Sequence, residues 1–173
     1  VMKSSTAWLL TDAMEDTTTI GTGSRLAFKD YKMPVAGKTG TASKNNDLWF
    51  VGGTPYYVAS SWCGYDTQQA ISSTSIAQKM WGAAMGKIHN GLAEKKFVDS
   101  KYVEKRYFCT ETGQLATASC PSKKVGWYKK SNIPAICKTH TGTALGDPDK
   151  IAAEEEKKKQ EAAKNESATS SGA

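Results

Sequence analysis

Three short strand-like stretches in the first half of the chain constrain its fold more than any other feature. They lie at 33–42, 48–52 and 56–65. The last two are separated by Gly53-Thr54-Pro55, a composition typical of a hairpin turn. Stretches with a helical spacing of apolar residues flank the three strands, at 4–17 and 73–90. The order helix, strand, hairpin, helix predicts an α+β fold in which a partial antiparallel sheet is covered by helices.

The second helical stretch carries an apolar stripe that predicts how it packs. The side chains of this stripe are Ile76, Ala77, Met80, Trp81, Ala84 and Ile88. We expect this face to pack on the sheet. We also expect packing within the core or across strands for the aromatic residues of the strands, which are Trp49, Phe50, Trp62 and Tyr65. For Cys63, on the third predicted strand, we expect a buried free thiol.

The chain is basic, and its positive charge is concentrated in the second half. The net charge is +6, and residues 91–140 contain ten Lys or Arg against four Asp or Glu. Such a surface favours polyanions, but no nucleic-acid-binding motif accompanies it, so nucleic acid is not predicted as a partner. No apolar run approaches the ~20 residues that span a bilayer.

Composition divides the chain into three parts. Residues 1–90 hold the predicted sheet and helices, and residues 91–147 form a smaller unit with three of the four cysteines. Residues 148–173 combine blocks of Glu, Lys and Ala with a Ser-rich end, and their low hydrophobicity predicts a disordered tail. A partial sheet has exposed edges and only part of a core, so we expect residues 1–90 to need further residues to fold well.

A Lys-Thr-Gly-Thr sequence lies on the first predicted strand, at 38–41. Two further strings follow it at short spacing, DLWFVGGTP at 47–55 and WCGYD at 62–66. Together the three resemble the C-terminal part of the transpeptidase domain of a class A (bifunctional) penicillin-binding protein of Gram-positive type. The resemblance implies a serine-type D,D-transpeptidase that cross-links peptidoglycan stem peptides and binds β-lactams. It also implies an extracytoplasmic location and no cofactor.

The resemblance gives roles to the residues of this strand. It implies that Lys38 contacts a serine of a second motif and helps to move a proton. It also implies that the hydroxyls of Thr39 and Thr41 bind a substrate carboxylate, and that the Thr41 N–H is one of two oxyanion donors. The residue types add to this, because Gly40 would let a substrate backbone lie against the strand and Lys38 would provide a positive potential.

The nucleophilic serine of this family lies in a Ser-x-x-Lys motif, and none occurs in these 173 residues. The family's second motif has the form Ser-x-Asn and precedes the Lys-Thr-Gly by a long stretch. Ser43-Lys44-Asn45 has this form, but it follows Lys38 by only a few positions and predicts a turn. We therefore expect an excised or processed piece that is inactive alone. Its expected partners are stem peptides, β-lactams and the upstream part of the same protein, which would also provide any membrane anchor. The basic segment adds anionic wall polymers as candidate partners.

Two other interpretations share some of these features. A serine β-lactamase or a D,D-carboxypeptidase carries the same strand motif, but the string at 47–55 and the long extension beyond residue 90 argue against both. A non-catalytic cell-wall-binding module would instead use the basic segment 91–140.

Cys109, Cys120 and Cys137 are candidates for a disulfide bond. Thr112-Gly113 predicts a hairpin turn between the first two, which a disulfide would staple, and one of the three cysteines would then remain free. The alternative is a structural zinc site that adds His140 to the three cysteines. Cys137 and His140 have the close spacing of zinc ligands, but Cys109 and Cys120 are too far apart for the usual knuckle. The extracytoplasmic compartment implied by the resemblance favours the disulfide, with His140 an ordinary surface histidine.

Overall fold

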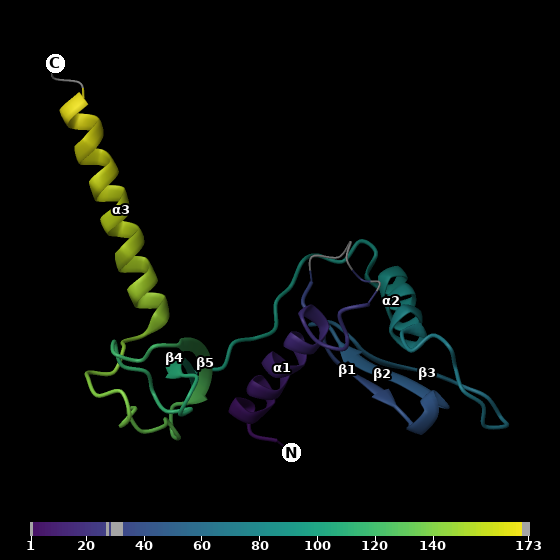
Figure 1. Ribbon diagram of the computed structural model, residues 1–173. Helices are drawn as coiled ribbons and strands as arrows, with labels where there is room; N and C mark the ends of the chain where they lie inside the picture. The colour runs from purple at the N-terminus through teal and green to yellow at the C-terminus, as the bar shows by residue number, and fades with distance from the viewer. Residues whose placement is uncertain (1, 27, 29–32, 171–173) are drawn as a thin grey trace. The chain divides into compact units, whose positions relative to one another are not determined.

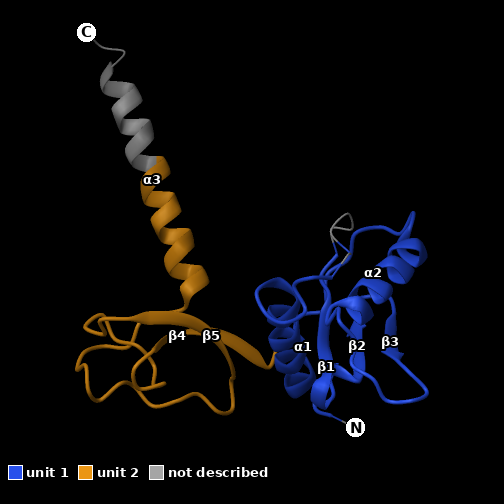
Figure 2. Ribbon diagram, turned by 45° about the vertical axis from the view of Figure 1, so that its right-hand side comes forward, with its two compact units in different colours: residues 1–100 blue, residues 101–173 orange. Residues whose placement is uncertain are grey.

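The structure, a computed structural model, describes residues 2–26, 28 and 33–170, with the side chains of 161–170 left out of the description (Figure 1). The chain divides into two compact units, Val1–Ser100 and Lys101–Ala173, called unit 1 and unit 2 (Figure 2). The boundary predicted after residue 90 lies next to the end of the helix α2 (Ile76–His89). In the structure, residues 91–100 group with unit 1.

Unit 1 contains a three-stranded antiparallel sheet with the order β1-β2-β3. The strands are β1 (Ala36–Thr41), β2 (Asp47–Gly53) and β3 (Val58–Gly64). They confirm the three predicted strands and the hairpin. A single 3-10 turn, η1 (Ser43–Asn45), joins β1 to β2, with Lys44 and Asn45 at φ 59° and 56°. Ser43-Lys44-Asn45, which has the form of the family's Ser-x-Asn motif, is therefore a tight turn, as predicted.

The helix α2 packs on β2 and β3 and closes the core of unit 1 (Figure 1). The indole of Trp81 is 2% exposed and meets the rings of Phe28 and Phe50 edge-on, with centroids 5.7 and 5.3 Å away. Burying one large apolar side chain contributes about 1.5–3 kcal/mol, so this aromatic cluster is a main source of stability. Cys63 is half-buried against this core as a free thiol, less deeply than predicted.

The buried face of α2 differs from the predicted stripe. Met80 and Ile88 are 47% and 52% exposed, and Ala84 is exposed as well, so the burial predicted for these three residues is wrong. The buried residues of the helix are Ala77, Gln78, Trp81, Gly82, Met85, Gly86 and His89. Two of these residues are glycines, and a search for large apolar residues at helical spacing does not detect buried glycines.

The helix α1 (Ser4–Thr19) packs against β1. The hydroxyls of Thr17 and Thr18, in its last turn, donate to the carbonyls of Gly37 and Val35. These bonds tie the helix to the beginning of β1. The second half of the strand, which carries the Lys-Thr-Gly-Thr sequence, lies beyond them.

Unit 2 is built on an antiparallel strand pair, β4 (Val103–Cys109) and β5 (Lys123–Lys129). The loops between β4 and β5 and after β5 are joined to the pair and to each other by short bridges such as Phe108–Leu115 and Leu115–Ile136. The buried cluster of this unit consists of Cys109, Ala116, Cys120 and Cys137. Most of its members are cysteines, so ordinary apolar packing contributes little to holding the unit together.

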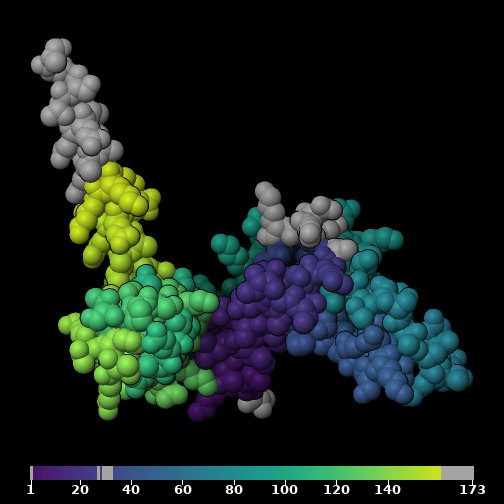
Figure 3. All heavy atoms as spheres, in the orientation of Figure 1, coloured from purple at the N-terminus to yellow at the C-terminus, as the bar shows by residue number. Residues whose placement is uncertain are grey.

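The helix α3 (Pro148–Ser170) occupies the segment predicted to be a disordered tail, and here the structure differs from the prediction. Ala, Glu and Lys are strong helix formers, and Glu-to-Lys pairs four residues apart, such as Glu154 and Lys158, add about 0.2–0.5 kcal/mol each. Residues 152–160 are exposed on all sides, as the projecting helix in Figure 3 illustrates. Among the described residues, no helix is both long and apolar enough to cross a membrane.

Candidate functional site

Lys38, Thr39 and Thr41 lie on β1, an edge strand of the sheet. The Lys38 ammonium donates to the Thr39 carbonyl at 3.0 Å and to the Thr39 hydroxyl at 3.2 Å. The Thr39 hydroxyl also lies 3.0 Å from the hydroxyl of Thr22. A cation and two hydroxyls therefore gather at one point of the strand, a combination suited to a carboxylate ligand.

The backbone of β1 presents alternate residues to its open edge. The Ala42 N–H donates to the Asp47 carbonyl at 2.9 Å. Because bonded and non-bonded pairs alternate in an antiparallel ladder, the N–H and C=O of Thr41 and Thr39 point away from β2. The Thr41 N–H therefore has the direction that an oxyanion donor needs. Its catalytic role stays a prediction.

A hollow of about 600 Å³ lies beside this edge, within the size range of small-molecule sites. Six of the described side chains that line it carry hydroxyls, and they are Thr22, Ser24, Thr39, Thr41, Thr74 and Ser75. Arg25 also lines the hollow and adds a cation to this polar wall. The lining suits a ligand that carries negative charge and many hydrogen-bonding groups.

Of the residues that line this hollow, the sequence singled out only Thr39 and Thr41, and Arg25 and Gln78 are among those it did not. Gln78 is 4% exposed on α2, and its amide donates to the Thr22 carbonyl at 3.1 Å. Its buried Oε1 has no hydrogen-bond partner among the residues that the structure describes. Gln78 is a polar residue next to the apolar stripe of a predicted amphipathic helix, and this position could have indicated a functional role. Nothing in the sequence distinguished Arg25 from other surface cations.

The predicted packing of the strand aromatics holds for three of the four. Trp49 and Trp62 pair across β2 and β3 with ring centroids 6.2 Å apart, and Phe50 is fully buried. Tyr65 is 52% exposed. A Cβ added to Gly40 would lie 3.1 Å from the Trp49 Cβ, so this glycine also permits close pairing with β2. Its role in admitting a substrate backbone stays a prediction.

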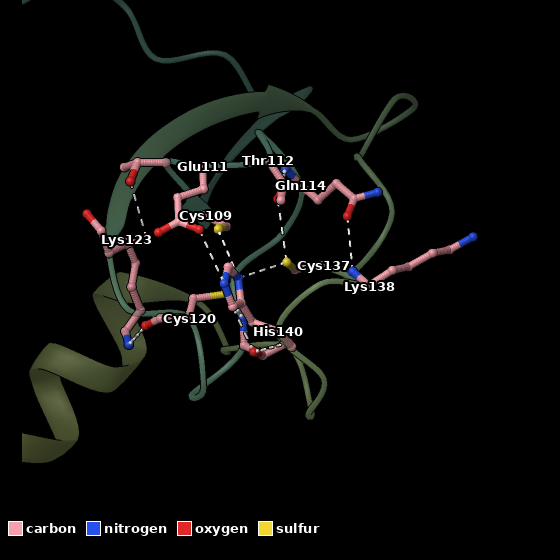
Figure 4. A network of polar contacts seen from close by, with 12 residues as sticks. Cys109, Glu111, Thr112, Gln114, Cys120, Lys123, Cys137, Lys138 and His140 are labelled. Atoms are coloured by element: carbon pink, nitrogen blue, oxygen red, sulfur yellow. Dashed lines mark hydrogen bonds and ion pairs between the residues drawn. The ribbon is translucent and has the colours of Figure 1, made fainter.

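In unit 2, Cys109, Cys120, Cys137 and His140 converge, with their ligand atoms all within 4.8 Å of one another (Figure 4). The three cysteines are buried free thiols, so the disulfide favoured from the sequence is not formed in the structure. The Nδ1 of His140 lies 3.5 Å from the sulfurs of Cys109 and Cys137. His140 is therefore a member of a cysteine cluster rather than an isolated surface histidine.

Hydrogen bonds shift the titration of this cluster. The Thr112 hydroxyl and the His140 backbone bond to the Cys137 sulfur and lower the pKa of this thiol to about 6. The same sulfur raises the pKa of the His140 ring, because a thiolate stabilises the protonated imidazole. Both shifts favour the thiolate form of Cys137.

Comparison with known families identifies unit 1. A profile of the penicillin binding protein transpeptidase domain matches residues 1–89. The chain belongs to the penicillin-binding protein transpeptidase family. Membership agrees with the resemblance seen in the residues of β1 and β2, and the matched region ends with α2.

Curated members of the penicillin-binding protein family extend the similarity further. Penicillin-binding protein 1A of Clostridium tetani is 31% identical over 152 residues, which cover 82% of this chain and 19% of the relative. The protein of the same name from Clostridium acetobutylicum is 36% identical over 135 residues, which cover 71% of this chain and 16% of the relative. This chain therefore spans less than a fifth of the length of these relatives.

A solved structure of the penicillin-binding protein family supports the fold. The crystal structure of penicillin-binding protein 1A from Haemophilus influenzae matches with a TM-score of 0.65 at 20% identity, covering 84% of this chain and 22% of that one. This likeness confirms the predicted α+β fold of a penicillin-binding protein fragment.

Proposed function

We propose that this chain supplies the substrate-binding strand of a serine-type D,D-transpeptidase that cross-links peptidoglycan stem peptides. One observation carries the proposal: the Thr41 N–H points to the open edge of β1, beside the Lys38 ammonium and the Thr39 hydroxyl. The family membership of residues 1–89 supports the same reaction class.

The polar edge of β1 fits a substrate that carries a carboxylate, as stem peptides and β-lactams do. The Thr39 hydroxyl would donate to this carboxylate, and Lys38 and Arg25 would provide positive potential around it. A hydrogen bond to a charged group contributes about 1.5–3 kcal/mol. These contacts would lay the substrate along β1 with its scissile carbonyl near the Thr41 N–H.

Acyl transfer also needs a nucleophile, which these 173 residues do not provide as a Ser-x-x-Lys motif. We assign it to a longer protein, in line with relatives of which this chain covers 19%. The serine Oγ would attack the penultimate D-alanine carbonyl, and the Thr41 N–H would donate to the developing oxyanion. D-Alanine would leave with a proton, and an amine of a neighbouring stem would take the acyl group. The chain alone would be inactive.

The proposed reaction also implies where the protein is located and which molecules it binds. Cross-linking of peptidoglycan would place the protein on the extracytoplasmic side of the cytoplasmic membrane, with any anchor in the longer protein. Stem peptides and β-lactams would bind at β1. Anionic wall polymers would meet the basic segment 91–140.

A fluorescent penicillin tests the proposal in the longer protein that contains this chain. We expect covalent labelling, a strong decrease with Lys38→Ala in a folded protein, and no change with Ser43→Ala. The second variant is a matched control, because Ser43 belongs to the turn η1.

Three results would contradict the proposal. A correctly folded longer protein that takes no label would favour a non-catalytic wall-binding module. Rapid turnover of the penicillin would favour a serine β-lactamase. Release of D-alanine from stem peptides without any cross-linked product would favour a D,D-carboxypeptidase.

A further inference from the structure

The cysteine cluster of unit 2 has the composition of a metal site. The ligand atoms of Cys109, Cys120, Cys137 and His140 all lie within 4.8 Å of one another. We propose that these four residues bind one Zn²⁺ ion in a closed, structural site that holds unit 2 together. This role is independent of acyl transfer, since none of the four residues takes part in the chemistry proposed for β1.

Two distances within the cluster match those around a tetrahedral zinc ion. Zinc lies about 2.3 Å from a thiolate sulfur and about 2.0–2.1 Å from a histidine nitrogen, so a sulfur and a nitrogen on one zinc are about 3.6 Å apart. The Nδ1 of His140 lies 3.5 Å from the sulfur of Cys109 and 3.5 Å from that of Cys137. Figure 4 shows the three cysteine sulfurs gathered around the imidazole.

The folding of unit 2 brings Cys109 and Cys120 together although they are distant in sequence. Cys109 ends β4, and the chain reverses at Gly113, which has φ 71° and donates its N–H to the Cys109 carbonyl at 2.8 Å. This reversal confirms the predicted turn. The returning segment is bonded to β4, since the Ala116 N–H donates to the Tyr107 carbonyl at 2.9 Å. Cys120 lies at the end of this segment, shortly before β5.

Cys137 and His140 come from the loop that follows β5. The Leu115 N–H donates to the Ala135 carbonyl, and the Cys137 N–H donates to the Leu115 carbonyl, both at 2.9 Å. The segment around Leu115 is thus bonded to β4 on one side and to this loop on the other. Three stretches of chain therefore meet at the four ligands.

The partners around the ligands match those of a zinc site. A histidine that binds a metal through one nitrogen usually donates its other N–H to a carboxylate or carbonyl. The Nε2 of His140 lies 3.3 Å from Glu111 Oε2, while its Nδ1 faces the sulfurs. The Thr117 N–H donates to the Cys120 sulfur at 3.3 Å, which stabilises a thiolate there.

A positive charge lies next to one of the ligands. Binding requires all three cysteines as thiolates, and the ion with three thiolates and a neutral imidazole would carry one negative charge. The Lys123 ammonium donates to the carbonyls of Cys120 and Ala118 at 2.8 and 3.2 Å. A cation is therefore held beside the ligand loop.

A disulfide would use only part of this arrangement. It would join two sulfurs and leave the third thiol buried beside His140. A zinc ion uses all four groups and cross-links a unit whose buried cluster has Ala116 as its one non-cysteine member among the described residues. Small units with so little apolar core depend on such a staple. Four protein ligands with no open position are typical of structural zinc.

Metal analysis and thiol counting of the full 173-residue chain, expressed with added zinc, test this proposal. We expect one zinc ion per chain and four reactive thiols after denaturation with a chelator. A zinc-free chain with two fewer reactive thiols would establish the disulfide and overturn the proposal. A chain with all its thiols that takes up no added Zn²⁺ would overturn it as well.

The absorption spectrum of bound Co²⁺ shows the geometry of the site and whether thiolates are ligands, and it can be recorded on the wild-type chain. Co²⁺ in place of zinc should give the intense visible bands of tetrahedral cobalt and a thiolate-to-cobalt charge-transfer band, and added Zn²⁺ should abolish both. Weak bands of six-coordinate cobalt without charge transfer would contradict the site, whether or not any variant folds.

A matched pair of cysteine variants locates the site. Cys120→Ser should lower the charge-transfer intensity by about a third, because one of three thiolates is lost. It should also weaken zinc binding by more than about tenfold. Cys63→Ser, which removes the free thiol of unit 1, should change neither. Equal effects of the two variants would overturn the assignment.

Discussion

The imidazole of His89 and the hydroxyl of Thr54 lie 2.7 Å apart, so the last turn of α2 is bonded to the connection between β2 and β3. The His89 Nδ1 lies 2.7 Å from the Met85 carbonyl, which can only accept. In the neutral ring, Nδ1 therefore carries the hydrogen and Nε2 accepts from Thr54. The Thr54 oxygen also accepts the backbone N–H groups of Tyr56 and Tyr57 at 3.2 and 3.3 Å. One buried hydroxyl thus joins the hairpin turn to the helix.

Removing this hydroxyl should destabilise unit 1. Thr54→Ala removes the hydroxyl that is bonded to the buried Nε2 of His89, so we expect the free energy of unfolding to fall by about 1–3 kcal/mol. Thr54→Ser keeps the hydroxyl and should cost less than half as much. Hydrogen exchange at the amides of α2 during a urea titration measures the free energy of unfolding of unit 1 separately from that of unit 2. Equal losses in the two variants would mean that the Thr54 methyl group, not the hydrogen bond, is responsible.

The pairing of β1 with β2 leaves no room for a side chain at Gly37. A Cβ there would lie 2.5 Å from the Phe50 Cζ, whose ring is fully buried. Gly37→Ala should therefore lower the free energy of unfolding by about 1–3 kcal/mol in the same titration. Gly40→Ala should cost less, because its Cβ would lie 3.1 Å from that of Trp49. The reverse order would contradict the packing described for β1.

The Thr39 hydroxyl should matter for acylation and not for folding. Thr39→Val keeps the shape of the side chain but removes the donor, so we expect the rate constant for penicillin acylation of the longer protein to fall about tenfold to hundredfold. Thr39→Ser should retain most of the rate. Stopped-flow labelling with a fluorescent penicillin measures the acylation rate constant of both variants. A wild-type rate for Thr39→Val would show that this hydroxyl does not contact the substrate carboxylate.

Glu15 on α1 should make the stability of unit 1 depend on pH. Burial raises the pKa of Glu15 from 4.5, with further contributions from the Asp12 and Asp16 carboxylates. The folded chain then holds this proton to a higher pH than the unfolded chain does. The contribution of Glu15 to stability is therefore most favourable below pH 4.5 and is lost as the pH rises through the folded pKa. Glu15→Gln should remove the decrease, stabilising unit 1 at neutral pH but not below pH 4.5. If the free energy of unfolding of the wild-type chain and of Glu15→Gln changed with pH in the same way, the prediction would be refuted.

The carboxylate of Glu111 should support zinc binding through His140. Glu111→Gln removes the charged acceptor that lies 3.3 Å from the His140 Nε2, so we expect zinc affinity to fall about tenfold. Competition with a chromophoric chelator measures the change. Glu154→Gln, on the exposed part of α3, alters the net charge equally and should leave the affinity unchanged. A similar loss in this control would assign the effect to charge alone.

The sequence predicted the strands and helices of unit 1 well, because their signals lie within one turn or one hairpin of the residues concerned. It predicted the buried face of α2 less well. Gly82, Gly86 and His89 are buried there, although none of them is a large apolar residue. The burial of His89 depends on tertiary contacts, such as its bond to Thr54, that the spacing along the helix does not specify. The helix at 148–170 differs from the predicted disordered tail for the opposite reason, since the local helix propensity of its Ala, Glu and Lys residues acts without an apolar face.

The sequence by itself determined the family, the α+β fold and the strand that carries Lys38, Thr39 and Thr41, because these follow from motifs and local spacing. Only the tertiary structure decided that the Thr41 N–H faces the open edge, since this depends on the register between β1 and β2. It also decided that Cys109 and Cys120 meet Cys137 and His140. Chain reversal and pairing between distant segments bring those ligands together, and spacing along the chain does not specify such contacts.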